Sequence, residues 1–318
     1  MKKEYLILLA LIVILSAYLF LHNTNKDHYT LPEIPKMDVA KITGFTLDKR
    51  DGSITFKKKG PHWTLTDKDY LADPPAVKNM LDTLKTLKLT ALVSEKGDLK
   101  RYELDDENHI RVKVSEGAKT VFELTLGRIA PSLNHTFVML TNDGNIYHAN
   151  GSFRSYFNKT EDDFRDKKVM EFKTASIHRF SIEKDGVSKT LVSKEEKKDN
   201  QQTAITWHFE DGTSADQEKV SNLLSALSFL ECETYVGALP KDELGKTPLL
   251  CRIRLENTDK PELTLFKTGD EDSVMGLSSM NDDTFVLSQF NSKEIVSDID
   301  TILGIIKNEE NKDQENKE

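Results

Sequence analysis

Two stretches of the chain repeat one pattern of apolar and polar positions, with equivalent residues 143 positions apart. In each stretch apolar residues recur at i, i+3, i+4, i+7 and i+10, which is the spacing of one face of an α-helix. The two sets are Val77, Met80, Leu81, Leu84 and Leu87, and Val220, Leu223, Leu224, Leu227 and Leu230. Asp73 and Asp216 precede them, and aspartate is a preferred N-cap. The pattern predicts two capped amphipathic helices of about 15 residues each.

Strand patterns surround both predicted helices. Asp-Gly pairs at 51–52 and 185–186 lie between alternating apolar runs, which is a strong hairpin signal. Trp63 and Trp207, the only tryptophans, follow these hairpins, and alternating runs such as "HIRVKV" and "LCRIRL" follow the helices. We therefore expect an α+β fold with two tandem repeats, each an antiparallel sheet with one main amphipathic helix.

The N-terminal segment has a different pattern. Residues 5–21, "YLILLALIVILSAYLFL", carry no charge and follow Lys2 and Lys3. As a helix these 17 residues span roughly 26 Å, the short end of a membrane crossing, and the lysines place the N-terminus in the cytoplasm. We expect residues 1–21 to form a cytoplasmic tip and an uncleaved transmembrane anchor in front of the repeats. The alternative is a cleaved signal peptide, for which Leu15 occupies a position that should be small.

The other boundaries follow from composition. Residues 22–41 form a polar linker, 42–176 the first repeat with its connecting helices, and 177–306 the second repeat. Residues 307–318 contain no apolar side chain and are expected to be disordered. With the anchor at its N-terminus, the protein is expected to be a single-pass protein of the cell inner (cytoplasmic) membrane, with the bulk of the chain extracytoplasmic.

Charge restricts the partners. The chain has 44 Lys and Arg against 53 Asp and Glu, a net charge of −9, and the two signs are interspersed. This argues against nucleic acid, whose binding needs a basic footprint. Arg111 and Lys113 match Arg252 and Arg254 on the polar side of equivalent predicted strands. They form either an ordinary solvent-exposed face or a basic stripe that binds an acidic partner.

The two cysteines, Cys232 and Cys251, fall in the part of the chain that is expected to be exported, where disulfides persist. Cys232 ends a helical pattern and Cys251 begins a strand pattern. A bridge between them would close a loop of about 20 residues and contribute about 3 kcal/mol to stability. The alternative is a pair of buried free thiols, and the sequence leaves both open.

Motifs for catalysis, metals or cofactors do not emerge. The eight histidines are scattered, and the sequence has no His-Glu-x-x-His, no Cys-x-x-Cys, no Gly-x-Ser-x-Gly and no Gly-rich phosphate loop. His135 and His148 could meet across a predicted hairpin, although two half-exposed strand histidines are the ordinary interpretation. Trp63 and Trp207 are expected to anchor the cores, with a sugar-stacking platform as the functional alternative. We expect no catalytic residue, no metal and no cofactor.

The order of several segments resembles a known family. These segments are "WTL", "ADPPAVKNMLDTLKTLKLTALV", "DLKRYELDD", "IRVKV", "FELTLGRI", "FVML", "IYHAN" and "FRDKKVMEF". Together they are similar to the bacterial domain of unknown function 4340, over most of the first repeat and more loosely over the second. The family usually has Tyr-Gly-Leu where this chain has Tyr102, Glu103 and Leu104. The resemblance implies an exported, membrane-anchored protein associated with ABC-type transport or gliding-type machinery, and it carries over no catalytic residue.

These features favour a non-enzymatic accessory or scaffold protein of an envelope or transport-associated complex. Its expected partners are the membrane, through residues 5–21, and a protein of the envelope such as ABC-type transport machinery. The first alternative is a hydrolase that acts on an envelope polymer. The second is a module that binds a glycan or a peptide.

Overall fold

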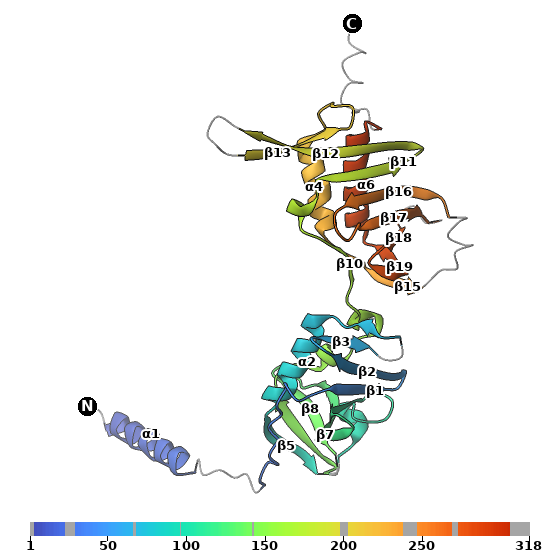
Figure 1. The fold of residues 1–318 in the computed structure, drawn as a ribbon. Coiled ribbons are helices and arrows are strands. Elements are labelled where there is room, and N and C mark those ends of the chain that lie inside the picture. The colour runs from blue at the N-terminus through green and yellow to red at the C-terminus, as the bar shows by residue number, and fades with distance from the viewer. Residues whose placement is uncertain are drawn as a thin grey trace. The chain divides into compact units, whose positions relative to one another are not determined.

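The computed structural model contains two compact units, residues Met1–Lys159 and Thr160–Glu318 (Figure 1). The residues that it describes are 3–22, 29–65, 68–95, 97–141, 143–197, 203–237, 247–268 and 273–305. The predicted tail at 307–318 and part of the predicted linker lie outside them. Each unit has its own main sheet and its own hydrophobic core.

The N-terminal segment forms the helix α1 (Lys3–His22). Its apolar side chains, such as Ile7, Leu11 and Ile14, are more than half exposed. In the described part of the chain, however, no helix is both long enough and apolar enough to cross a membrane. The structure therefore does not support the predicted transmembrane helix over residues 5–21.

The first unit is a sheet that carries a helix on one face. Its elements are β1 (Gly44–Lys49), β2 (Gly52–Lys59), β3 (His62–Leu65), β4 (Tyr70–Leu71), α2 (Pro74–Thr86), β5 (Leu89–Glu95), η1 (Leu99–Tyr102), β6 (Ile110–Glu116), β7 (Lys119–Ile129), β8 (His135–Leu140), β9 (Asn145–Asn150) and α3 (Arg154–Phe157). Among the described residues the sheet has nine strands in the order β4-β3-β2-β1-β6-β7-β8-β9-β5, and neighbouring strands are antiparallel. Helix α2 buries Val77, Met80, Leu81 and Leu84, which are four members of the predicted apolar stripe.

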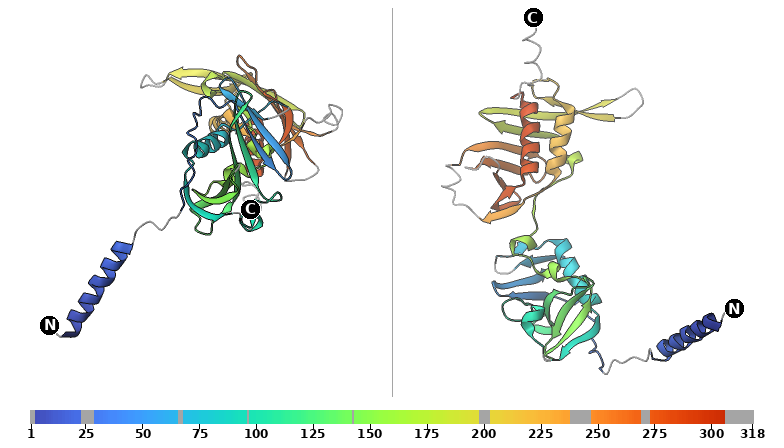
Figure 2. Two further views of the ribbon diagram at one scale, coloured as in Figure 1. Left: turned by 90° about the horizontal axis from the view of Figure 1, so that it is seen from below. Right: turned by 180° about the vertical axis from the view of Figure 1, so that it is seen from behind.

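The second unit carries two long helices on its main sheet. Its elements are η2 (Asp162–Phe164), β10 (Lys168–Glu171), η3 (Thr174–Ser176), β11 (Arg179–Lys184), β12 (Val187–Lys197), β13 (Thr203–Phe209), α4 (Gln217–Ser228), β14 (Phe229–Glu231), β15 (Thr234–Gly237), β16 (Leu249–Glu256), β17 (Glu262–Lys267), β18 (Val274–Ser278), β19 (Asn281–Leu287) and α6 (Gln289–Leu303). In the described residues the order is β13-β12-β11-β16-β17-β18-β19-β15, and β10 and β14 form a separate pair. Figure 2 shows α4 and α6 side by side on one face.

The two main sheets share a strand order. The series β3-β2-β1-β6-β7-β8-β9-β5 and β13-β12-β11-β16-β17-β18-β19-β15 follow the same path along the chain. The hairpins predicted at 51–52 and 185–186 join β1 to β2 and β11 to β12. Asp73 and Asp216 cap α2 and α4, and each carboxylate accepts a hydrogen bond from a backbone N–H three residues on, at 3.0 and 3.1 Å. The predicted α+β class, the hairpins and the caps are confirmed.

Helix α6 is a feature that the sequence analysis missed. The prediction gave each repeat one main helix, whereas α6 packs beside α4 and buries Ile295, Ile299 and Ile302. The local signals for this helix are present in the sequence. Ser288 caps its first turn, and Gly304 ends it in the left-handed conformation that glycine favours.

Residues 160–176, which the prediction assigned to the first repeat, pack within the second unit. Strand β10 pairs with β14, and the Asp162 carboxylate accepts a hydrogen bond from the Thr234 hydroxyl at 2.8 Å. The short helices predicted for this connection are present as α3, η2 and η3. Tertiary contacts thus place the boundary between the units at Lys159 and Thr160.

Candidate functional site

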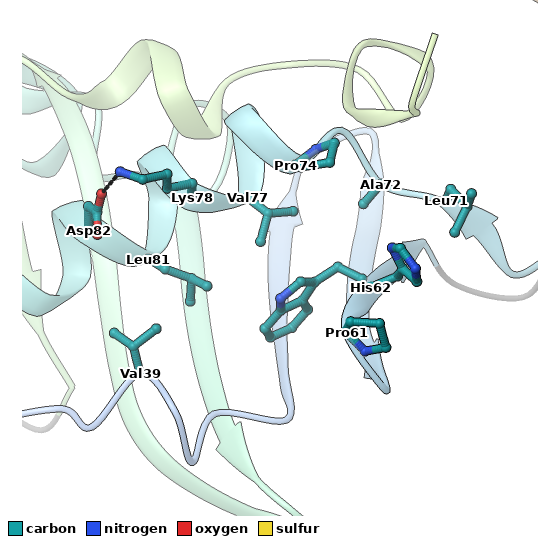
Figure 3. A pocket seen from close by; sticks show the side chains of 11 residues that line it. Val39, Pro61, His62, Leu71, Ala72, Pro74, Val77, Lys78, Leu81 and Asp82 are labelled. Carbon is teal, nitrogen blue, oxygen red and sulfur yellow. Dashed lines mark hydrogen bonds and ion pairs between the residues drawn. The ribbon is translucent and has the colours of Figure 1, made fainter. Parts of the chain in front are cut away.

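A groove of about 290 Å³ opens in the first unit between α2 and the strand that carries Trp63 (Figure 3). Its walls are mostly apolar, and they include Val39, Leu71, Val77 and Leu81. In Figure 3, Leu81 on α2 and Val39 on the segment before β1 point toward one another across the groove. Leu71, on the edge strand β4, is 51% exposed, so the apolar surface continues out of the groove.

Local structure places Trp63 beside the start of α2. The backbone N–H of Ala72 donates to the carbonyl of Trp63 at 2.9 Å, and Asp73 then caps the helix. The indole ring contacts Phe45 of the core, with ring centroids 5.2 Å apart. The ring is nevertheless only half-buried, because Pro74 and its neighbours leave part of it open to the groove. An aromatic ring in this position offers a ligand a flat apolar surface.

The polar groups at the groove lie on its rim. Lys78 and Asp82 form an ion pair at 2.5 Å, and their side chains are 74% and 55% exposed. Exposed pairs of this kind contribute at most about 1 kcal/mol, so a ligand can replace either partner at little cost. His62 also lines the groove, on β3 next to the edge strand β4. The arrangement suits binding through apolar contact, with a few polar groups that orient the ligand.

The second unit has an equivalent groove of about 550 Å³ beside Trp207 and α4. Here Gln217 accepts a hydrogen bond from the backbone N–H of Trp207 at 2.7 Å and donates one to its carbonyl at 2.8 Å. Trp207 is only 7% exposed. Pro74 stands at the corresponding position of the first unit, directly after the capping aspartate, and has no side chain for such bonds. The two grooves therefore differ, since the tryptophan ring of the first is the more open.

The predicted basic stripe is paired with carboxylates in the first unit. Arg111 lies 3.7 Å from Glu123 on the neighbouring strand β7, and Lys113 lies 2.9 Å from Asp48 on β1. Burial opposes ionisation of Asp48, but hydrogen bonds from Ser53 and Lys113 outweigh it and lower the pKa of this carboxyl. The two cations therefore take part in cross-strand ion pairs.

The same holds for the second unit. Arg252 lies 3.2 Å from Glu183 and 3.3 Å from Glu262, and Arg254 lies 3.0 Å from Glu262. Opposite charges on neighbouring strands stabilise the sheet. The four predicted residues therefore form ion-pair ladders that carry little net positive charge.

Cys232 and Cys251 are buried free thiols in the structure, which is the second of the two alternatives that the sequence left open. Burial raises the pKa of Cys232 to about 11 and that of Cys251 to about 12. Because the thiolate is the reactive form, both side chains are protonated and unreactive near neutral pH.

His135 and His148 meet as the hairpin pattern suggested, with their rings stacked at a centroid distance of 5.1 Å. Burial, and then the neighbouring imidazole of His135, lower the pKa of His148 below its usual value. Within the described residues no group of three potential metal ligands is gathered anywhere. The pair is therefore a contact between two strand histidines.

The turn at Glu103 is strained. Glu103 follows η1 with a φ of 57°, in the left-handed region that favours glycine. This is the position at which the resembled family usually has glycine. The Glu103 carboxylate lies 3.6 Å from the guanidinium of Arg154, whose side chain is largely buried. The side chain thus gains an ion pair at a backbone position that disfavours it.

The second unit contains buried ion pairs that the sequence analysis missed. Lys184 on β11 pairs with Asp300 on α6, and Arg165 pairs with Asp283 at 2.7 Å. Arg165 also stacks on Tyr235, with its guanidinium 3.6 Å from the ring centroid. These pairs attach α6 and the segment after residue 160 to the sheet. For Asp300 the signal in the sequence was an aspartate within the apolar face of a helix, a position that is unfavourable unless the carboxylate is paired.

Comparison with known proteins identifies the family of the chain. The family model described as "Domain of unknown function (DUF4340)" matches residues 63–249, more than half of the chain, so the chain belongs to this family. The match runs from β3 of the first unit into β16 of the second. Searches of the curated proteins and of the solved structures found no match.

Proposed function

We propose that the protein is a membrane-anchored, extracytoplasmic, non-enzymatic accessory or scaffold protein of an envelope or transport-associated complex. The observation that carries the proposal is the groove at Trp63. A half-buried aromatic ring, apolar walls and an exposed ion pair are the features of a docking site for a protein segment. ABC-type transport machinery of the envelope is the partner class that the family resemblance favours.

Two observations support attachment to the inner membrane. The side chains of α1, such as Leu8, Leu9 and Val13, are apolar and more than half exposed. A helix that is apolar all round needs an apolar environment, such as lipid or a protein interior. Lys2 and Lys3 precede the apolar segment, which favours a cytoplasmic N-terminus. Extraction of cell membranes should therefore yield mature protein that begins at or near Met1, and a start after about residue 20 would contradict an anchor.

We also propose that the two units arose as tandem copies of one domain. Support comes from the shared strand order, the equivalent tryptophans and the two helices capped by Asp73 and Asp216. On this proposal the two grooves have diverged. In the second unit Gln217 forms hydrogen bonds with the backbone of Trp207, and in the first unit the groove at Trp63 is open to bind a partner.

A glycan- or peptide-binding module is the second candidate, and one specific observation favours it. Pro61, His62 and Pro74 line the groove together with Trp63, and an open aromatic ring such as that of Trp63 can bind a sugar or an extended proline-containing peptide. A hydrolase finds less support. Asp82, which lines the groove, is already paired with Lys78, whereas a hydrolase needs convergent groups within hydrogen-bond distance of one another.

The experiment is affinity capture of the full chain from detergent-solubilised membranes after chemical cross-linking. Trp63→Ala and Leu71→Ser should both lose a stoichiometric partner that the wild type retains. Tyr156→Ser is the matched control, because Tyr156 is 42% exposed in the same unit but does not line the groove. An identical set of captured proteins in all four samples would contradict docking at this groove. Hydrolysis of an isolated cell-wall polymer by the purified chain would favour the enzyme instead.

A further inference from the structure

A row of aromatic rings in contact runs through the first unit from η1 across β8 and β9, with the buried Phe137 in its middle. Tyr102 of η1 contacts Phe137 of β8 at a centroid distance of 4.8 Å. Phe137 contacts His148 of β9 at 4.9 Å, and His148 stacks on His135 at 5.1 Å. The row shares no residue with the lining of the groove at Trp63.

Two arginines lie against the Tyr102 end of this row. The guanidinium of Arg101 lies 5.8 Å from the centroid of the Tyr102 ring, and that of Arg128 lies 5.6 Å from the Phe137 ring. Arg128 Nε–H donates to the backbone carbonyl of Arg101 at 2.8 Å. Residues 101 and 128 therefore lie side by side, each with its guanidinium over an aromatic ring.

The backbone at Gly127 on β7 lies very close to η1. A Cβ at position 127 would lie 2.2 Å from the carbonyl oxygen of Tyr102, so only glycine allows η1 to sit this close to β7. Gly127 directly precedes Arg128, and Arg101 directly precedes Tyr102. The contact that needs Gly127 thus also brings the two arginines together.

No carboxylate among the residues that the structure describes forms an ion pair with Arg101 or Arg128. Six of the nine arginines, all of which the structure describes, lie within 4.0 Å of a carboxylate oxygen. Arg101 and Arg128 have no such ion pair among the described residues, in a chain whose net charge is −9. Guanidiniums on neighbouring residues repel one another when no carboxylate is paired with them, and an anion bound to both would offset that repulsion. An anion is the partner that these two side chains could bind.

We infer that Arg101 and Arg128 form a binding site for a phosphate group. The planar guanidinium donates in a fork that matches two phosphate oxygens, and aromatic rings behind it fix its orientation. A phosphate presents enough oxygens for two forks at once, whereas a carboxylate presents two oxygens in all. The phosphate can belong to a lipid headgroup or to a free phosphate compound, and the chemistry of recognition is the same. This inference does not depend on the proposed docking at Trp63.

The test follows the Nε–H NMR signals of the arginines in the full chain, held in phosphate-free dodecyl maltoside micelles and titrated with inorganic phosphate. The signals of Arg101 and Arg128 should shift in a saturable way. Arg101→Gln and Arg128→Gln should each weaken binding roughly tenfold or more, as the loss of a hydrogen bond to a charged group does. Arg128→Lys should fall between wild type and Arg128→Gln, because it keeps the charge and loses the fork. Arg50→Gln is the matched control, since Arg50 is exposed in the same unit and likewise has no carboxylate ion pair among the described residues.

A second arm identifies the source of the phosphate. Addition of phosphatidylglycerol to the micelles should shift the same two signals without added inorganic phosphate if a lipid headgroup occupies the site. If phosphate shifts them and phosphatidylglycerol does not, the site binds a free phosphate compound. The inference is overturned if neither shifts them, if Arg50→Gln weakens binding as much as Arg128→Gln, or if acetate binds as tightly as phosphate. Thermal unfolding of each variant checks that a loss of binding is not a loss of folding.

Discussion

Leu84 and Leu227 occupy equivalent positions on α2 and α4, and both are buried, at 1% and 0% exposure. Truncation of either to alanine removes three carbon atoms from a packed interior. At about 0.8 kcal/mol for each buried CH₂ unit, the transfer cost alone is roughly 2.4 kcal/mol. The cavity that remains adds to this cost, so each variant should lose about 2–5 kcal/mol of unfolding free energy. That is a large share of the ~5–15 kcal/mol available to a typical domain.

The assay is hydrogen exchange of the full chain, with limited proteolysis as a second readout. Because the chain contains two compact units, Leu84→Ala should raise exchange throughout the first unit and Leu227→Ala throughout the second. Proteolysis should release the unaffected unit, cut near the boundary at 159–160. Lys85→Ala and Asn222→Ala are the controls, since both side chains are exposed on the same helices. Loss of both units together in either leucine variant would refute the reasoning and indicate one shared core.

The remaining predictions concern single residues. Asp73→Ala and Asp216→Ala should each cost about 1 kcal/mol in denaturant unfolding, without further loss of function in a complementation assay. Glu103→Gly should be about 1 kcal/mol more stable than Glu103→Ala, because both lose the Arg154 pair but only glycine relieves the positive φ; equal stabilities would argue against strain there. The pKa of His148 is lowered in the folded chain, so the unfolded chain binds the proton more readily. The neutral imidazole therefore contributes stability that is present above about pH 6.5 and is lost as the pH falls below it. His148→Phe should therefore lose less stability than wild type between about pH 7 and about pH 5.

The local elements could be predicted because their causes are local. The stripe of Val77, Met80, Leu81 and Leu84 is set by the helical period alone. An N-cap such as Asp73 bonds to an N–H only three residues away, and an Asp-Gly turn needs nothing beyond its own backbone. The meeting of His135 with His148 followed in the same way, since strand register across a short hairpin is set by nearby residues.

Helix α6 is an element that the local signals did not predict. Its apolar spacing and caps were present in the sequence, but Asp298 and Asp300 interrupt the apolar face. Only the tertiary structure supplies their partners, Lys219 and Lys184, which lie far away in the sequence. A buried carboxylate is unfavourable without such a partner, so the two aspartates argued against a buried helix face until their partners were known.

The sequence by itself determined the family, the α+β class, the two capped helices and the hairpins. Only the tertiary structure decided which side chains are available to a partner. It placed carboxylates of neighbouring strands against the predicted basic residues and left Arg101 and Arg128 with none among the described residues. It also left the ring of Trp63 more open than that of Trp207. The physical reason is that charge pairing and burial depend on residues from distant strands, and a pattern along the chain does not contain those distances.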